Sequence, residues 1–347
     1  MRLISEFERL GMTRSKLDNA LFYYHYEGKL IGVATTHVDD VVWAGTKYFE
    51  DKVIKVIKQT FKISRENRLH FVYLGLCLEQ RNSNIQLHQK EYSDQLKSIE
   101  IVNRKNRKPT DEISDIEKAE LRSRIGQLNW LSTQTRPDIS YDVCQASVNF
   151  QKAVLKDLDQ INKVVRKVKY DNVMLNFKDI GNLNGCKVIC YSDASFRNLN
   201  EEGSQGGFIV FIQNKNDEII PIQWQSKRIK RIVKSTIAAE CLSMIEASEA
   251  AYLLKLLLEE ILAGNCNIDI SCVIDNQSLH NAIHSTKCVE DRGLRPDIAL
   301  LREKLANGEI TDVKWVESSQ QLADCLTKAG ASSKQLLEVL SSGMLQN

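Results

Sequence analysis

Residues 187–195, KVICYSDAS, decide which fold the sequence predicts, because they form an apolar strand pattern that ends near an acidic residue, Asp193. Two more strand-like runs follow, GGFIVFIQ at 206–213 and EIIPIQWQ at 218–225. The remaining expected elements are a helix over about 236–263, a strand at 268–274, helices from about 277 and over about 297–306, a strand at 311–316 and a helix beginning near 320. This order predicts a mixed β-sheet with flanking helices.

Four acidic residues occupy special places in this pattern. Asp193 and Asp275 each end an expected strand. Glu240 lies one turn into the long helix, and Asp324 lies at the start of the last expected helix. If the first and fourth strands are parallel neighbours, their carboxyl ends bring Asp193 and Asp275 to the edge where open α/β sheets place their sites. Helices packed on the sheet could deliver Glu240 and Asp324 to the same edge.

Such a group of carboxylates needs positive charge, because like charges a few ångströms apart repel and raise each other's pKa. Carboxylate oxygens suit Mg²⁺, and two ions about 4 Å apart can clamp an in-line displacement at phosphorus. Any one of these acids alone, such as Asp275, could instead be a helix cap or a surface charge. The hypothesis of a metal site therefore depends on all four together.

Five motifs around these acids resemble the ribonuclease H region of copia-type LTR-retrotransposon Pol polyproteins. They are YSDAS at 191–195, WQSKR at 224–228, KSTIAAE at 234–240, VIDNQS at 273–278 and QLADCLTK at 321–328. The resemblance implies hydrolysis of the RNA strand of an RNA–DNA hybrid with two Mg²⁺ or Mn²⁺ ions. The catalytic and metal-binding residues that it implies are Asp193, Glu240, Asp275 and Asp324. Gly206 and Gly207 also match, and without Cβ atoms they permit close backbone approach.

The sequence departs from this family in the segment LRPDI at 294–298. Arg295 stands where the family commonly carries His, whereas Asp297 is retained. A His-assisted step near the leaving group is therefore not expected. His280 and His284 lie on a different predicted helix and are interpreted as surface residues.

The first hundred residues form strand patterns that include a second acidic motif. LFYYHY at 21–26 and LIGVATTHV at 30–38 predict a hairpin that turns at Glu27-Gly28. Asp39 and Asp40 follow at an expected tight turn, and a helix is expected over about 48–61. FVYLGLCLEQ at 71–80 and IQLHQ at 85–89 predict another hairpin. The next segment, over about 101–185, is predicted to be mainly helical.

This region resembles the reverse-transcriptase palm and the helical region beyond it in the same family. The matching segments are LGMTRSKLDNALFYY at 10–24, HVDD at 37–40, FVYLGL at 71–76, LHQKEYSDQL at 87–96 and LRSRIGQLNWLSTQTRPDISYDV at 121–143. The resemblance implies that Asp39 and Asp40 bind metal in an RNA-directed DNA polymerase that uses an RNA template and a DNA primer. His37 replaces the usual Tyr. The family's earlier carboxylate and finger segments lie upstream of the matched region, so the chain is expected to be truncated and inactive as a polymerase.

The predicted fold class is therefore α/β and α+β, in four parts. These are the C-terminal part of a reverse-transcriptase palm at 1–100, a helical thumb or connection at 101–185, a ribonuclease H-like domain at 186–333 and a C-terminal tail at 334–347. Two other functions remain open. One is a non-catalytic nucleic-acid-binding relic of such an element. The other is an integrase or transposase, for which Glu309 is the late acid near the required spacing, although it precedes a strand instead of lying on a helix.

Net charge is only +2, so nucleic-acid contact must come from local basic patches. The cluster that precedes the helix bearing Glu240 is the preferred candidate, and it comprises Lys227, Arg228, Lys230, Arg231 and Lys234. Two other clusters are Arg104, Lys105, Arg107 and Lys108, and Lys163, Arg166, Lys167 and Lys169. Each cluster could equally be a solvated charged face.

The composition indicates an intracellular protein. Nine cysteines are present without a CxxC pair, which indicates reduced thiols and argues against a zinc site on spacing grounds. The apolar stretch at 251–262 is too short and too charged to span a bilayer. The expected location is the cytoplasm, within a virus-like particle, with the nucleus as an alternative. The expected partners are RNA–DNA hybrid, RNA template and DNA primer, and other Pol-derived domains such as integrase, with no membrane.

Overall fold

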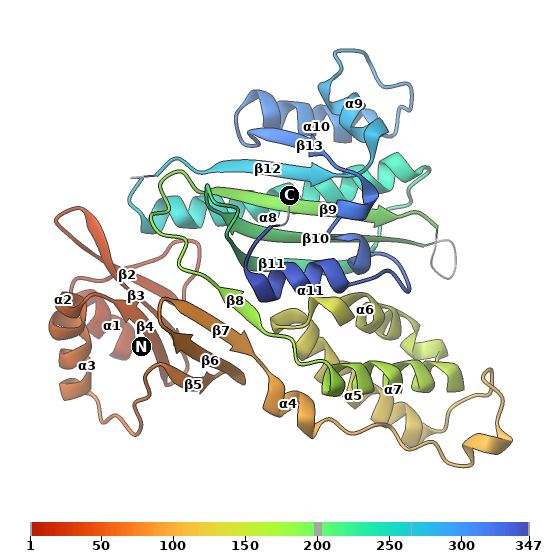
Figure 1. Ribbon diagram of the computed structural model, residues 1–347, viewed down its shortest axis with the longest axis horizontal. Helices are drawn as coiled ribbons and strands as arrows, with labels where there is room; N and C mark the ends of the chain where they lie inside the picture. Colours follow the sequence, from red (N-terminus) through yellow and green to blue (C-terminus); the bar gives the residue numbers. More distant parts are fainter. Residues whose placement is uncertain (1, 198–202, 265, 346–347) are drawn as a thin grey trace.

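The computed structural model describes residues 2–197, 203–264 and 266–345. Three β-sheets and a helical module follow one another along the chain (Figure 1). The mixture of sheets and helices confirms the expected fold class. No helix within the described ranges is both long and apolar enough to cross a membrane.

The first sheet is antiparallel, and its strands are β1 (Thr13–Arg14), β2 (Leu21–Tyr26), β3 (Lys29–His37) and β4 (Asp40–Gly45). It packs with α1 (Arg2–Arg9), α2 (Lys47–Phe49), a π-helical turn (Glu50–Ile54) and α3 (Lys55–Thr60). Phe49 fills the contact between the layers, and a Cβ atom at Gly32 would lie 2.2 Å from its ring. Glycine at position 32 therefore permits the close approach of helix and sheet.

The second sheet contains β5 (His70–Tyr73), β6 (Leu76–Arg81), β7 (Asn84–His88) and β8 (Leu175–Phe177), all antiparallel. The expectation of one strand over 71–80 was wrong. The chain reverses at Leu74 and Gly75, where φ is +51° and +75°, so this segment is itself a hairpin. β8 follows the helical module in the chain and pairs with β7, so it ties the end of that module back to the second sheet.

The helical module begins with α4 (Lys90–Gln95) and contains α5 (Asp115–Gln134), α6 (Ser140–Asn149) and α7 (Leu155–Tyr170). Ser114 and Glu117 form a capping box at the start of α5. A short 3₁₀ turn, Pro137–Ile139, leads into α6 and carries a buried ion pair between Arg136 and Asp138. The expected helical character of this region is confirmed.

The last sheet has the order β11-β10-β9-β12-β13. Its strands are β9 (Lys187–Ser195), β10 (Ser204–Gln213), β11 (Ile219–Ile229), β12 (Asp269–Ile274) and β13 (Asp312–Trp315). β9, β10 and β11 pair antiparallel, whereas β12 pairs parallel with both β9 and β13. The predicted parallel pairing of the first and fourth strands is therefore confirmed.

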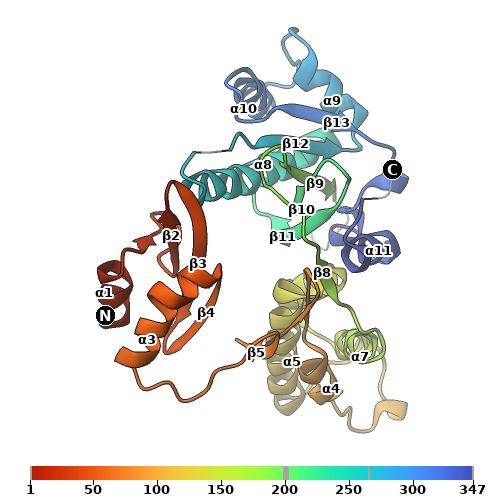
Figure 2. The same ribbon diagram turned by 60° about the vertical axis from the view of Figure 1, so that its left-hand side comes forward.

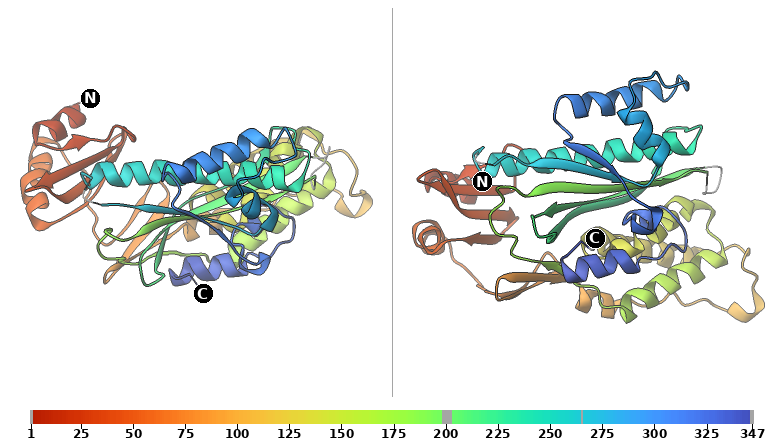
Figure 3. Two further views of the ribbon diagram at one scale, coloured as in Figure 1. Left: turned by 90° about the horizontal axis from the view of Figure 1, so that it is seen from above. Right: turned by 45° about the horizontal axis from the view of Figure 1, so that its top comes forward.

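Both faces of this sheet are covered (Figure 3, left). One face packs against α8 (Thr236–Ile261), α9 (Gln277–His284) and α10 (Arg295–Ala306). The other face packs against α11 (Lys334–Ser342). Along β9, Val188 and Cys190 belong to the first core, and Ile189 to the second. This two-sided burial explains the nearly continuous apolar runs of the strands.

The expected helix from about residue 320 does not form. The segment instead makes two short 3₁₀ turns, Ser318–Gln320 and Asp324–Leu326. The Gln321 side chain donates to the backbone oxygen of Ser192 and accepts from the backbone nitrogen of Ala323. These bonds hold the segment against β9 in a non-helical conformation.

Hydrogen bonds join the last sheet and its helices to the helical module and to the N-terminal region. The indole of Trp224 on β11 donates to the backbone oxygen of Ser132 on α5 at 2.6 Å. The first sheet approaches the C-terminal end of α8 (Figure 2), where Glu260 accepts from the Ser15 hydroxyl at 2.7 Å and from the Lys16 backbone nitrogen at 2.8 Å.

Candidate active site

Asp193 lies near the end of the central strand β9, directly opposite Gly207 on β10, and is 1% exposed. The Ser243 hydroxyl of α8 donates to the backbone oxygens of Asp193 and Gly207, at 2.8 and 3.0 Å. This one side chain therefore fixes the helix against both strands. Glu240 lies one turn earlier on α8, and it is consequently held against the same end of β9.

Asp275 follows β12, the parallel neighbour of β9. The Ser318 hydroxyl donates to its Oδ2 at 2.6 Å, and the Trp315 indole donates to its backbone oxygen at 2.9 Å. One carboxylate oxygen each of Asp193, Glu240 and Asp275 lies within 4.8 Å of the others. The predicted convergence of these three acids is present in the structure.

Two oxygens of this group, Asp193 Oδ1 and Glu240 Oε2, are buried without a hydrogen-bond partner among the described residues. Burial, and then the charges of Asp193 and Asp275, raise the pKa of Glu240 well above its ordinary value. Burial also raises the pKa of Asp193, although Lys328 and Thr327 oppose that change. The site thus offers buried acceptor atoms whose negative charge is poorly compensated, which fits a divalent cation held by oxygen ligands.

Asp324 lies beside this group of three, and Lys328 connects it to them. The Lys328 ammonium pairs with Asp324 and lies 3.4 Å from Asp193 Oδ2. The Thr327 hydroxyl also donates to Asp193 Oδ2. Burial lowers the pKa of Lys328, but the carboxylates of Asp193 and Asp324 outweigh this effect and raise the pKa overall. Sequence reasoning missed Lys328, although its place four residues after Asp324 in QLADCLTK was visible.

Gly207 allows the segment bearing Asp324 to approach β10. A Cβ atom at this position would lie 2.7 Å from Leu326 Cβ and 2.9 Å from Thr327 Cγ2. At Gly206 the closest contact would be 3.4 Å, which is close to ordinary. Gly207 therefore permits the close backbone approach that the sequence predicted for both glycines, whereas a side chain at Gly206 would meet no such close contact.

The preferred basic cluster lies at the end of β11 and in the connection to α8. Lys227 pairs with Glu246 at 2.8 Å, and Arg231 pairs with Asp297 at 2.9 Å. No ion pair involves the other three basic side chains within the described residues, and these are Arg228, Lys230 and Lys234. Those three are consequently the better candidates for phosphate contact.

Asp39 and Asp40 lie at the exposed tip of the β3–β4 hairpin, beside His37. Val38 at the turn has φ of +53°, an uncommon conformation for a β-branched residue. Within the described residues, neither aspartate belongs to a group of three metal-ligating side chains.

The remaining residues singled out in the sequence lie outside the acidic group. Arg295 begins α10 and donates to the backbone oxygen of Val289. His280 and His284 stack on α9 with ring centroids 4.3 Å apart. Glu309 precedes β13 and pairs with Lys304 at 3.3 Å.

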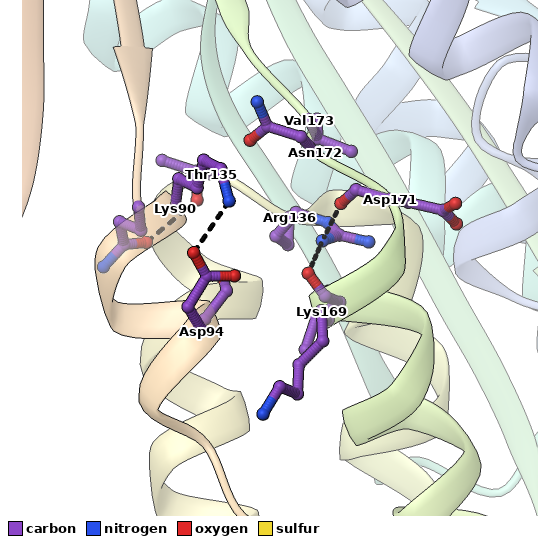
Figure 4. Close-up of a pocket in the computed structure, with 11 residues that line it drawn as sticks. Lys90, Asp94, Thr135, Arg136, Lys169, Asp171, Asn172 and Val173 are labelled. Carbon is purple, nitrogen blue, oxygen red and sulfur yellow. Dashed lines mark hydrogen bonds and ion pairs between the residues drawn. The ribbon is translucent and has the colours of Figure 1, made fainter.

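A separate pocket lies in the helical module and contains none of the four acids (Figure 4). Its lining includes Lys90, Asp94, Arg136, Lys169 and Asp171. Lys90 pairs with Asp94, and Arg136 donates to the backbone oxygen of Asp171. These side chains largely satisfy one another, so the acidic group at the sheet edge remains the candidate active site.

The mixed sheet with this acidic edge has the ribonuclease H-like arrangement that the sequence predicted. The chain is similar to the retrovirus-related Pol polyproteins from transposons RE1 and RE2 of Arabidopsis thaliana, with 25% identity over 92% of this chain in each case. The resemblance inferred from the motifs is thereby confirmed. The chain spans 22% of the length of each of these relatives. No protein-family model matches it.

Two solved structures also resemble parts of the chain. Ribonuclease H1 from Halobacterium salinarum NRC-1 is 22% identical, with a TM-score of 0.31. The matched region covers 41% of this chain and 94% of the ribonuclease chain. The foamy viral protease-reverse transcriptase in complex with RNA/DNA hybrid is 15% identical, with a TM-score of 0.48. The matched region covers 86% of this chain and 37% of the viral chain.

Proposed function

We propose that the chain is a ribonuclease H that hydrolyses the RNA strand of RNA–DNA hybrids and also carries part of a polymerase palm. The observation that carries this proposal is the convergence of Asp193, Glu240 and Asp275, two of which have buried oxygens without a partner. The similarity to retrotransposon Pol polyproteins supports the choice of substrate.

Asp193, Glu240, Asp275 and Asp324 would hold two Mg²⁺ or Mn²⁺ ions. Such a pair of ions, when bound, supplies activation of water and stabilisation of the leaving oxygen at phosphorus. Ser243 and Ser318 hold Asp193 and Asp275 in position through the bonds described above. Lys328 supplies positive charge between Asp193 and Asp324, which lowers the repulsion within the group.

The direct test is a cleavage assay on the purified chain with three end-labelled substrates of one sequence: RNA–DNA hybrid, duplex DNA and duplex RNA. We expect divalent-cation-dependent cleavage of the RNA in the hybrid only, because the 2′-OH and the hybrid shape distinguish this substrate. Tight hybrid binding without any cleavage would favour the alternative, a non-catalytic relic. Equal cleavage of duplex DNA would contradict the substrate assignment.

The basic cluster gives a prediction about binding. Replacing Arg228 and Lys230 by Ala should weaken hybrid binding and lower its log–log salt slope by about one for each lost phosphate contact. Replacing Lys227 and Arg231 by Ala should have a smaller effect on the slope, because these side chains already pair with Glu246 and Asp297. Fluorescence anisotropy at several salt concentrations measures both. An unchanged slope in the first variant would mean that the cluster is only a solvated surface.

Polymerase activity is expected to be absent from this chain alone. Nucleotidyl transfer needs carboxylates on both sides of a metal pair. Asp39 and Asp40 come from one hairpin, and within the described residues no third ligand joins them. Primer extension with an RNA template, deoxynucleotides and Mg²⁺ should give no product above background. Robust extension by the chain alone would show that this assignment is wrong.

A further inference from the structure

A second group of metal-ligating side chains lies on the β5–β6–β7 sheet, away from the proposed nuclease site. His70 on β5 lies opposite Glu79 on β6, and Cys77 on β6 lies opposite His88 on β7. Cys77 and Glu79 are two residues apart on one strand, so all four side chains project from the same face. Oxygen, nitrogen and sulfur ligand atoms of Glu79, His70 and Cys77 lie within 4.8 Å of one another.

We propose that this face binds one zinc ion through His70, Cys77 and Glu79, with His88 positioning the Glu79 carboxylate. The proposal is independent of the nuclease activity. It also departs from the expectation drawn from cysteine spacing, because strand pairing brings together ligands from two neighbouring strands, β5 and β6. Imidazole, thiolate and carboxylate together suit zinc, and three protein ligands leave the fourth position to water.

Two of the three distances between ligand atoms are near those expected around a tetrahedral ion. Bonds of about 2.3 Å to sulfur and about 2.0 Å to nitrogen separate those two ligands by about 3.5 Å. The distance from Cys77 Sγ to His70 Nε2 is 3.4 Å. His70 Nε2 lies 3.8 Å from Glu79 Oε1, compared with about 3.4 Å for ideal nitrogen and oxygen ligands. Because the His70 side chain is 70% exposed, it is free to close this difference.

The surroundings orient the ligands. The two carboxylate oxygens of Glu79 have different partners. Oε2 accepts a hydrogen bond from Arg81 at 2.7 Å, and Oε1 faces His70 and His88. His88 Nε2 lies 3.2 Å from Oε1, and its Nδ1 accepts from the Lys90 backbone nitrogen at 3.3 Å. That contact places the ring proton of neutral His88 on Nε2, so His88 donates to Glu79 and acts as a positioning residue.

Apolar packing contributes little to this hairpin. None of the residues of β5 or β6 belongs to the four hydrophobic cores formed by the described parts of the chain. β5 is a four-residue edge strand, and short hairpins are only marginally stable by themselves. An ion held by His70 on β5 and by Cys77 and Glu79 on β6 would fasten this edge strand to the sheet.

The test uses Co²⁺ as a spectroscopic substitute for zinc in the full chain. It is made in a His284→Ala background, because the stacked pair of His280 and His284 could bind cobalt separately. We expect the near-ultraviolet thiolate-to-cobalt absorption band together with the visible bands of tetrahedral cobalt. Added zinc should remove these bands, since zinc binds such sites more tightly than cobalt. The acidic group should not contribute, because its ligands are oxygens.

Three variants and one matched control decide the outcome. Cys77→Ser should abolish the thiolate band, and His70→Ala should weaken cobalt binding without affecting folding, because that side chain is exposed. His88→Ala should keep the band but lower the affinity about 10- to 100-fold. Cys288→Ser, a change at an exposed cysteine elsewhere, should leave the spectrum unchanged. Absence of the band in the parent, its survival in Cys77→Ser or its loss in Cys288→Ser would each overturn the proposal.

Discussion

Replacing Asp193 by Asn is expected to lower the rate of hybrid cleavage by at least about 10²-fold, the cost typical of losing one electrostatic contact in a transition state. The substitution keeps the size of the side chain but removes the charge of its buried Oδ1, which has no partner among the described residues. A site with one carboxylate fewer should hold divalent cations less tightly, so catalysis should fail even at saturating substrate.

A second measurement separates this cause from misfolding. Ions that bind only the folded chain raise its melting temperature. Mg²⁺ should therefore raise the Tm of the parent and have less effect on Asp193→Asn. Asp312→Asn is the matched control, because Asp312 belongs to the same sheet but begins β13 outside the acidic group. Full cleavage by Asp193→Asn, or an equal loss in Asp312→Asn, would contradict the assignment.

Replacing Asp138 by Ala is expected to cost about 3–5 kcal/mol of stability in the helical module. The Asp138 side chain is fully buried and accepts from Arg136 Nε and Nη2 at 2.8 and 2.9 Å, with Lys167 Nζ also at 2.9 Å. Removal of the carboxylate would leave the buried Arg136 without a counter-charge. Asp159→Ala is the control, because its exposed pair with Arg104 should contribute at most about 1 kcal/mol.

The ion pair of Asp138 should also make the stability of the helical module depend on pH. Burial raises the pKa of Asp138, but Arg136 and Lys167 outweigh burial and lower it overall. A lowered folded-state pKa gives stability that is present above the unfolded value of about 4 and is lost as pH falls through the folded value. Urea unfolding followed by circular dichroism should show the largest difference between the parent and Asp138→Asn at neutral pH. A difference that stays constant into strong acid would contradict an ionic role for Asp138.

Much of the last sheet could be predicted from the sequence, because strands buried on both faces leave long apolar runs such as that of β9. The parallel neighbours β9 and β12 then brought Asp193 and Asp275 together as expected. The turn at Leu74–Gly75 escaped prediction, since FVYLGLCLEQ is apolar on both sides of it. Lys328 escaped because a lysine four residues after an aspartate is typical of a helix surface. In the structure this segment is a turn packed against β10, and the turn places Lys328 beside Asp193.

Strand β8 has a consequence for how the chain folds during synthesis. Ile85 on β7 pairs with Phe177 on β8, so the second sheet needs a strand that the ribosome releases only after the entire helical module. Long-range pairings of this kind form slowly, because loop closure must precede them. Until then β7 would present an open edge able to pair with another chain. Fragments that stop before residue 175 are therefore expected to aggregate, whereas fragments that extend beyond residue 177 can close the sheet.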